Sequence, residues 1–115
     1  MSTDKINTES AEHYVWGGNC DGWRLVKTPE LSIILERMPP GASEQRHHHT
    51  YARQFFFVLE GELTMEVEGV EQRLTQEQGL EIAPGEKHQA INRSSADVRF
   101  IVTSQPPSHG DRVLE

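Results

Sequence analysis

The segment from residue 41 to residue 61, GASEQRHHHTYARQFFFVLEG, constrains this chain more than any other stretch. Within it, His47 and His49 flank His48, and Gln54 opens a run of apolar residues. Side chains two residues apart in an extended strand lie on one face, so the imidazoles of His47 and His49 point the same way and that of His48 points the opposite way. Two imidazoles at this spacing suit one divalent metal. The segment therefore predicts a strand that carries half of a metal site, and the rest of the chain must supply further ligands and a scaffold.

The rest of the chain has the pattern of short strands separated by turns. Residues 62–68 alternate apolar and acidic or hydroxyl side chains, as expected of a half-buried antiparallel strand, and residues 97–104 alternate in the same way. Other strands are expected over residues 25–27, 31–38, 54–59, 70–74, 80–83 and 88–92. Glu68-Gly69 is a typical hairpin turn. Because no stretch shows a helical period, the pattern predicts an all-β barrel or double-sheet jelly roll.

The predicted organisation is a flexible N-terminal arm over residues 1–12, a single barrel domain over residues 13–104 and an irregular C-terminal tail over residues 105–115. Trp16 and Trp23 lie in a stretch rich in aromatic residues and glycine, and they are expected to close one end of the core. The tail contains two prolines and is expected to lie over the mouth of the barrel. His109 and Asp111 then come near the mouth, but no catalytic role is expected of them.

Charge and cysteine content narrow the classes of partner. The formal net charge of −7 argues against binding to nucleic acid or to an anionic membrane surface. Cys20 is the single cysteine, so no intrachain disulfide can form and a reducing compartment is expected. No apolar run approaches the roughly 18 residues that span a bilayer, and the polar N-terminus does not resemble a secretory signal. We therefore expect a cytoplasmic protein whose partner is a small molecule.

Four side chains are candidate metal ligands: His47, His49, Gln54 and His88. His88 follows the Pro84-Gly85 turn, and three adjacent strands of a small barrel can direct such residues into one cavity. Neutral imidazole is a common ligand of first-row metals, and an amide oxygen is a weaker one. Taken singly, the histidine run also fits a solvated loop and His88 a surface position. The joint spacing favours the metal site.

These residues resemble the motifs of the cupins. The first cupin motif is G-x5-H-x-H-x3-4-E-x6-G, and Gly41, His47, His49, position 54 and Gly61 fall at its spacings, with Gln54 in place of the usual glutamate. The second motif is G-x5-P-x-G-x2-H-x3-N, which Gly85, His88 and Asn92 match, while Ala83 and Glu77 stand where its proline and first glycine usually lie. The resemblance covers residues 31–103.

The resemblance implies a conical barrel of about six to eight strands, the double-stranded β-helix. It also implies one divalent first-row transition metal per chain (zinc, nickel, manganese or iron) held by His47, His49, Gln54 and His88. The ligand pattern is similar to that of the small cupins of pectin breakdown, which open unsaturated uronates to linear keto sugars. With four neutral ligands, a divalent ion keeps its full charge and acts as a strong Lewis acid, which weighs against oxidative chemistry.

The resulting hypothesis is a metal-dependent isomerase or lyase-like enzyme acting on a small oxygen-rich metabolite such as a sugar acid. A non-catalytic cupin that binds a metal and a small molecule, and a metal-dependent dioxygenase, remain as alternatives. Tyr51, Arg53, Met65 and Phe100 are candidates for substrate binding, with Arg53 suited to a carboxylate. Surface placement of Arg53 and core packing of Met65 and Phe100 are the competing interpretations. No general acid or base can be identified from the sequence.

The strand that begins at Gln54 also predicts a homodimer. If Gln54 faces the cavity, Phe55, Phe57 and Leu59 must point to the opposite face of the sheet. Three large apolar side chains on an outer face usually mark a protein contact, and small cupins commonly pair through one sheet. The alternative is that the Trp16–Trp23 region or the tail folds back and covers them.

Overall fold

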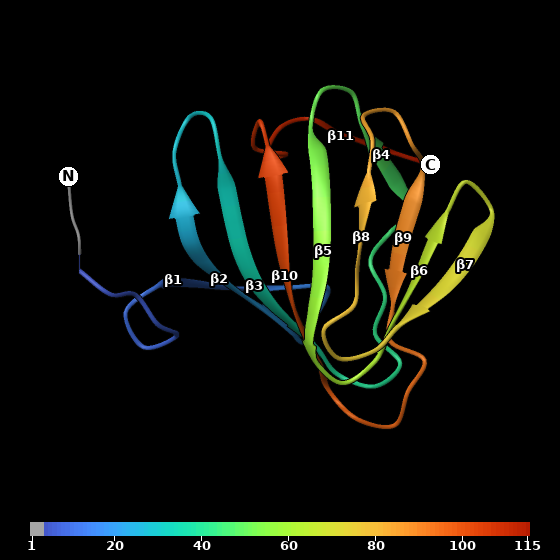
Figure 1. The fold of residues 1–115 in the computed structure, drawn as a ribbon, viewed down its shortest axis with the longest axis horizontal. Helices are drawn as coiled ribbons and strands as arrows, with labels where there is room; N and C mark the ends of the chain where they lie inside the picture. The colour runs from blue at the N-terminus through green and yellow to red at the C-terminus, as the bar shows by residue number, and fades with distance from the viewer. Residues whose placement is uncertain (1–3) are drawn as a thin grey trace.

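The computed structural model describes residues 4–115, and its regular elements in that range are all strands (Figure 1). The strands are β1 (Glu12–Trp16), β2 (Cys20–Lys27), β3 (Ser32–Met38), β4 (His47–His49), β5 (Arg53–Glu60), β6 (Leu63–Val67), β7 (Val70–Leu74), β8 (Gly79–Ile82), β9 (His88–Ile91), β10 (Val98–Gln105) and β11 (Arg112–Leu114). Residues 1–3 of the expected N-terminal arm lie outside the described residues. No helix in the described part of the chain is long and apolar enough to cross a membrane.

The strands form two antiparallel sheets. The first has the order β1-β2-β3-β10-β5-β8 and the second the order β11-β4-β9-β6-β7. The chain passes back and forth between them, so strands far apart in sequence become neighbours, and β10 lies between β3 and β5 (Figure 1). This is the double-stranded β-helix, or jelly roll, that the sequence predicts.

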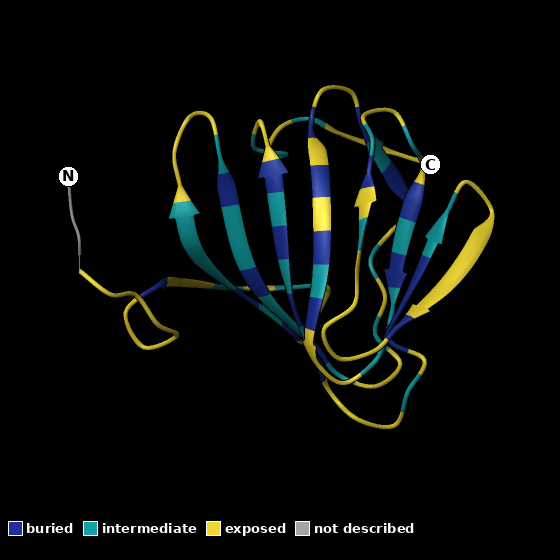
Figure 2. Cartoon of the chain, in the orientation of Figure 1, coloured by how far each residue is buried: buried dark blue, intermediate teal, exposed yellow. Residues whose placement is uncertain are grey.

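Strand β5 shows how the core is built. Gln54, Phe56 and Val58 are buried, whereas Phe55 and Leu59 are exposed, and the alternation is visible along the strand in Figure 2. The inward residues of both sheets pack into one core, whose largest fully buried apolar side chains are Phe100, Met38, Leu63, Met65 and Ile82. The period of two in the sequence therefore assigned the faces of β5 correctly, because neighbouring strand residues must point to opposite sides.

The turn between β6 and β7 also follows the sequence. Glu68 and Gly69 have φ values of 50° and 87°, and they join the paired residues Val67 and Val70. A two-residue hairpin turn with two positive φ values matches the right-handed twist of the strands, and glycine adopts such a φ without steric cost.

Residues 13–23 match only in part the expectation that Trp16 and Trp23 close one end of the core. They form a hairpin in which β1 pairs with the first part of β2, and β1 already begins at Glu12. Trp16 packs against the core as expected. Trp23 does not. Its register partner Leu35 lies on the opposite face of β3 from the core residue Met38, so Trp23 points to the outer face of the sheet.

The C-terminal tail was expected to be irregular over residues 105–115, but part of it is a strand. Residues 112–114 form β11, which pairs with β4 along the histidine run. Its isolated sequence carries no strand period, and the pairing depends on a strand edge about 65 residues earlier in the chain. The tail thereby becomes part of the site described next.

Candidate metal centre

Two neighbouring strands of the second sheet bring three histidines together. His47 and His49 lie two residues apart on β4, and His88 on β9 is the register partner of His47. All three are buried, and they present ligand atoms within 4.8 Å of one another. The cluster thus unites the two halves of the sequence pattern.

The backbone sets the orientation of each imidazole ring. In every case Nδ1 lies within hydrogen-bonding distance of a main-chain carbonyl oxygen. The carbonyl partners of His47, His49 and His88 are Gln45 (2.7 Å), Asp111 (3.1 Å) and Glu86 (2.9 Å). A carbonyl can only accept, so Nδ1 carries the proton and Nε2 keeps its lone pair. The Nε2 atoms of His49 and His88 are buried and have no hydrogen-bond partner among the described residues.

Burial keeps these imidazoles neutral. It lowers the pKa of His47 to about 3 and also lowers the pKa values of His49 and His88. Neutral imidazole with a free Nε2 is the form that binds a metal ion.

Gln54 presents its amide oxygen in the same way. Its Nε2 donates a hydrogen bond to Oγ of Ser104 at 3.0 Å, while its Oε1 is buried without a partner among the described residues. Ser104 thereby orients the amide. Three buried atoms with free lone pairs, one oxygen and two nitrogens, fit a divalent first-row ion better than they fit an empty polar interior, where each unpaired group would be costly.

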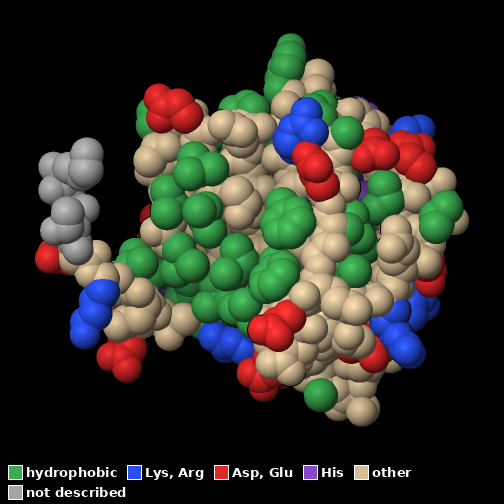
Figure 3. Space-filling view, in the orientation of Figure 1, with side chains coloured by type: hydrophobic (Ala, Val, Ile, Leu, Met, Phe, Trp, Pro, Cys, Tyr) green, Lys and Arg blue, Asp and Glu red, His purple; other side chains and the backbone are tan. Residues whose placement is uncertain are grey.

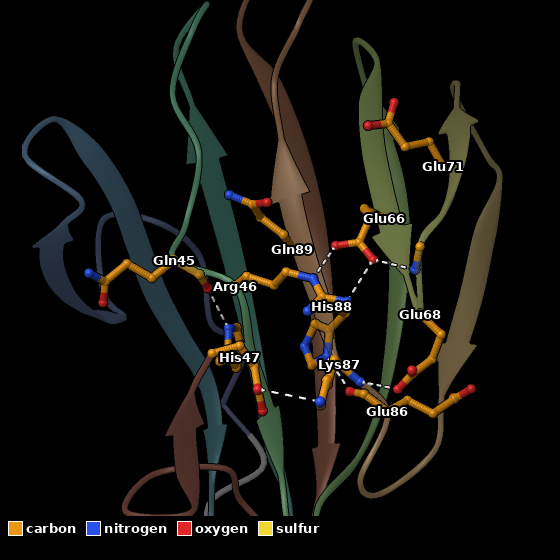
Figure 4. Close-up of polar contacts among 12 residues, drawn as sticks. Gln45, Arg46, His47, Glu66, Glu68, Glu71, Glu86, Lys87, His88 and Gln89 are labelled. Atoms are coloured by element: carbon orange, nitrogen blue, oxygen red, sulfur yellow. Dashed lines mark hydrogen bonds and ion pairs between the residues drawn. The ribbon is translucent and has the colours of Figure 1, made fainter.

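Residues on the outer side of β4 hold the strand in place. His48 points away from the cluster, as its position in the strand predicts, and its Nδ1 is paired with the carboxylate of Glu115. Next to it, Arg46 forms a two-pronged ion pair with Glu66 of β6, with a Nε to Oε1 distance of 2.6 Å (Figure 4). Figure 4 also shows His47 and His88 side by side.

Asp111 ties the C-terminal tail to the site. Its carboxylate accepts hydrogen bonds from the backbone N–H groups of Thr50, Tyr51 and Ala52 at 3.0, 2.9 and 3.0 Å. Its own carbonyl oxygen is the partner of His49 Nδ1. Asp111 was expected near the mouth of the barrel, but its anchoring role was not predicted, because the sequence carries no local signal for it.

The cluster opens onto a cavity of about 690 Å³ between the sheets. His47, His49 and Gln54 line it, and other walls come from β1, β2, β3, the loop before β4 and β11. The polar and aromatic side chains on those walls include Tyr14, Trp16, Arg24, Glu36, Glu44 and Arg112. The cavity therefore combines a candidate metal centre with acidic, basic and aromatic groups.

Two carboxyl groups in the cavity have raised pKa values. Burial and the nearby charge of Glu44 raise the pKa of Glu36 to about 8, and burial raises the pKa of Glu44 to about 7. The guanidinium of Arg24 lies over the ring of Tyr14, 4.7 Å from its centroid. Its Nε is buried and has no hydrogen-bond partner in the described part of the chain, although a carboxylate oxygen of Glu12 lies at 3.7 Å. At neutral pH the side walls of the cavity are thus less acidic than their composition suggests.

The four residues proposed from the sequence for substrate binding do not line this cavity. Tyr51 is 72% exposed, and Arg53 is paired with Glu81 on the outside of the barrel at 2.6 Å. Met65 and Phe100 are fully buried in the core. A signal for Glu36 was present, because the period of two places it on the same face of its strand as Ile34 and Met38. Arg24 carried no such signal, since β2 has an irregular register beyond it.

Comparison with known protein families agrees with this geometry. Residues 34–104 match the Cupin domain family. The chain belongs to the cupins. This cupin is 29% identical to the tetracenomycin polyketide synthase protein TcmJ of Streptomyces glaucescens over 69 residues. The aligned residues make up 60% of this chain and 46% of TcmJ. The chain spans about half the length of the curated relatives it matches.

Solved structures share the whole fold. KdgF from Halomonas sp. superposes with a TM-score of 0.83 at 19% identity, covering 92% of this cupin and 96% of KdgF. An RmlC-like cupin from Shewanella frigidimarina also gives a TM-score of 0.83, at 26% identity, with coverage of 95% and 96%. The cupin fold and the family resemblance found in the sequence are confirmed.

Proposed function

We propose that this cupin is a metal-dependent isomerase or lyase-like enzyme acting on a small oxygen-rich acid such as a sugar acid. The observation that carries the proposal is the buried histidine cluster, which faces a large cavity containing both acid–base groups and guanidinium groups. His47, His49, Gln54 and His88 would hold one divalent first-row ion. With these neutral ligands, the ion would supply Lewis-acid polarisation of a substrate oxygen.

The charges of the cavity suit an anionic substrate. Arg24 and Arg112 line it, and they take the carboxylate-binding role that the sequence analysis gave to Arg53. Glu36 and Glu44 oppose them weakly at neutral pH, because their raised pKa values keep a large fraction of each group protonated. The local field therefore attracts a carboxylate although the whole chain is acidic.

The comparisons support two substrate classes. The ligand pattern resembles that of the uronate-linearising cupins, and the fold is shared with KdgF over almost the whole chain. The sequence relatives TcmJ and CurC are named as polyketide synthase proteins, so a polyketide is the second candidate substrate. Tyr14, Trp16 and Phe56 on the cavity wall offer aromatic surface for either ligand.

We also propose that two copies pair through the outer face of the first sheet. By strand register, Trp23, Leu35, Ile101 and Phe57 lie in one row across that face. Figure 3 shows hydrophobic side chains gathered there over β2, β3, β10 and β5. Phe55 beside this row is 44% exposed, and the described part of the chain does not cover it. A second copy would bury the exposed apolar surface of this face in a closed two-fold contact.

Elemental analysis of protein purified without added metal tests the metal centre. We expect about one first-row ion per chain, and its loss in a His47→Ala/His49→Ala/His88→Ala variant. Full occupancy in the triple variant would contradict the site.

Nuclear magnetic resonance (NMR) of the wild-type protein mixed with uronates, keto acids, aromatic diols and polyphenols then identifies the substrate class. Conversion of none of them would contradict an enzymatic function on these classes, and oxygen consumption by iron-loaded protein would favour the dioxygenase.

A further inference from the structure

Glu36 occupies a distinctive place on the inner face of the first sheet. On β3 it is in register with Gly22 of β2 on one side and Phe100 of β10 on the other. Its hydrogen-bond partner among the described side chains is the phenol of Tyr14, in a long contact of 3.5 Å from Oη to Oε2. Glu36 is only partly exposed, and it lines the same cavity as His47 and His49.

Gly22 makes the contact between Tyr14 and Glu36 possible. The two residues Tyr14 and Gly22 are paired across β1 and β2, and the tyrosine ring lies over the glycine. A Cβ at position 22 would come within 2.3 Å of Cζ of Tyr14, so any larger residue would displace the ring. The phenol therefore reaches Glu36 because the intervening residue has no side chain.

Glu44 is less suited to proton transfer than Glu36. Its Oε1 accepts a hydrogen bond from the backbone N–H of Ala90 at 3.0 Å, and its backbone N–H donates to the carbonyl of the same residue at 3.1 Å. These bonds fasten the loop before β4 to β9, which is a structural role. Glu36 is not tied to the backbone in this way among the described residues.

We infer that Glu36 is the proton-transferring group of this cavity and that Tyr14 is its positioning residue. The inference rests on the proposed function and names the acid–base group for it. The Glu36 carboxylate takes a proton from a substrate carbon next to a carbonyl, or from an enol hydroxyl, and the electron pair of the broken bond stays on the substrate. The carboxyl group then returns the proton to a neighbouring substrate atom. No other reactant is needed, because the substrate is isomerised without net oxidation.

The surroundings of Glu36 suit this exchange. The ionisable groups near Glu36 come from β1 (Tyr14), β2 (Cys20 and Arg24), the loop before β4 (Glu44) and β11 (Arg112). Burial and the charge of Glu44 raise its pKa, whereas the Tyr14 hydrogen bond and Arg112 lower it, and the balance is about 8. A carboxyl group with this pKa can both accept and donate a proton near neutral pH.

The test compares Glu36→Gln with Glu60→Gln, a matched change at the exposed end of β5. On the substrate identified by the panel above, we expect kcat of Glu36→Gln to fall by about 10²–10⁴-fold, with metal content unchanged and KM within about threefold. Tyr14→Phe keeps the ring but removes the donor, so it should shift the rise of kcat/KM with pH to higher pH. Glu60→Gln should match the wild type.

A measurement without substrate keeps the inference separate from the proposed function. Carbon-13 NMR titration of the glutamate carboxyl groups, with the Glu36 signal assigned by its loss in Glu36→Gln, should give a midpoint near 8. If Glu36→Gln folds poorly, Tyr14→Phe assigns the signal instead: the Glu36 resonance is the one whose high midpoint rises further when the Tyr14 hydrogen bond is removed, and no such rise overturns the role of Glu36. A midpoint in the ordinary glutamate range, or undiminished turnover in Glu36→Gln, overturns the role of Glu36 alone. A wild-type protein that converts none of the panel overturns both proposals.

Discussion

Replacing Asp111 by alanine tests whether the C-terminal tail supports the metal centre. The carboxylate accepts three backbone hydrogen bonds from the loop between β4 and β5. Ala52 is only 2% exposed, so its N–H would lose its partner without access to water, at a cost of about 1–3 kcal/mol. Thr50 and Tyr51 are exposed, and water would replace most of their bonds. We therefore expect Asp111→Ala to destabilise the protein by about 2–3 kcal/mol in total.

Thermal unfolding of metal-free protein, followed by circular dichroism, measures this loss. For a domain of this size, about 1 kcal/mol corresponds to roughly 4 °C, so the melting temperature should fall by roughly 8–12 °C. Competition with a chelating dye should also show metal affinity weakened by about 10–100-fold, because the segment that orients His49 is loosened. Asp111→Asn keeps one acceptor oxygen and should lose less stability.

Asp97→Ala is the matched control for this experiment. Its carboxylate is 52% exposed and forms an ion pair with Arg37 at 3.2 Å, and such a pair is worth less than about 1 kcal/mol. If Asp111→Ala lies within about 0.5 kcal/mol of the control, and metal affinity is unchanged, then the tail does not support the site and the reasoning from its hydrogen bonds is wrong.

Three further predictions concern other parts of the molecule. Gln54→Glu places a negative charge among the neutral ligands and should tighten binding of a divalent ion in a chelator competition; unchanged affinity would mean that Gln54 is not a ligand. Glu36 has a pKa of about 8 in the fold against an ordinary 4.5, so between these values the native state holds a proton that the unfolded chain has lost. The lowered pKa values of the three buried histidines act in the opposite direction below about pH 6.5, so the Glu36 contribution is read from the comparison with Glu36→Gln. In urea titrations of metal-free protein, the stability of the wild type relative to Glu36→Gln should fall as pH rises from about 5 to 8; a constant difference would refute it. Phe57→Glu should convert the expected dimer to a monomer of 13.1 kDa in light scattering, whereas a wild-type protein that is already monomeric would sink the pairing.

Much of the fold was predictable because strand periodicity is a local property. The alternation around Gln54 and Phe55 assigns the two faces of β5, and the Glu68-Gly69 pair marks a hairpin that the structure contains. The spacing of His47 and His49 likewise predicts that both imidazoles share a face. In each case the geometry follows from residues within a few positions of one another.

The surroundings of the site were decided by the tertiary structure. Asp111 reaches His49 across 62 positions of sequence, and Tyr14 reaches Glu36 across 22, because particular strands become neighbours in the sheets. Periodicity tells which side chains share a face, but it does not tell which strand lies beside which. The candidate substrate-binding residue Arg53 therefore lies outside the barrel, while Arg24, from a strand with an irregular register, lines the cavity. The sequence determined a cupin barrel with a candidate metal cluster, and the long-range pairing of its strands decided which charges face that cluster.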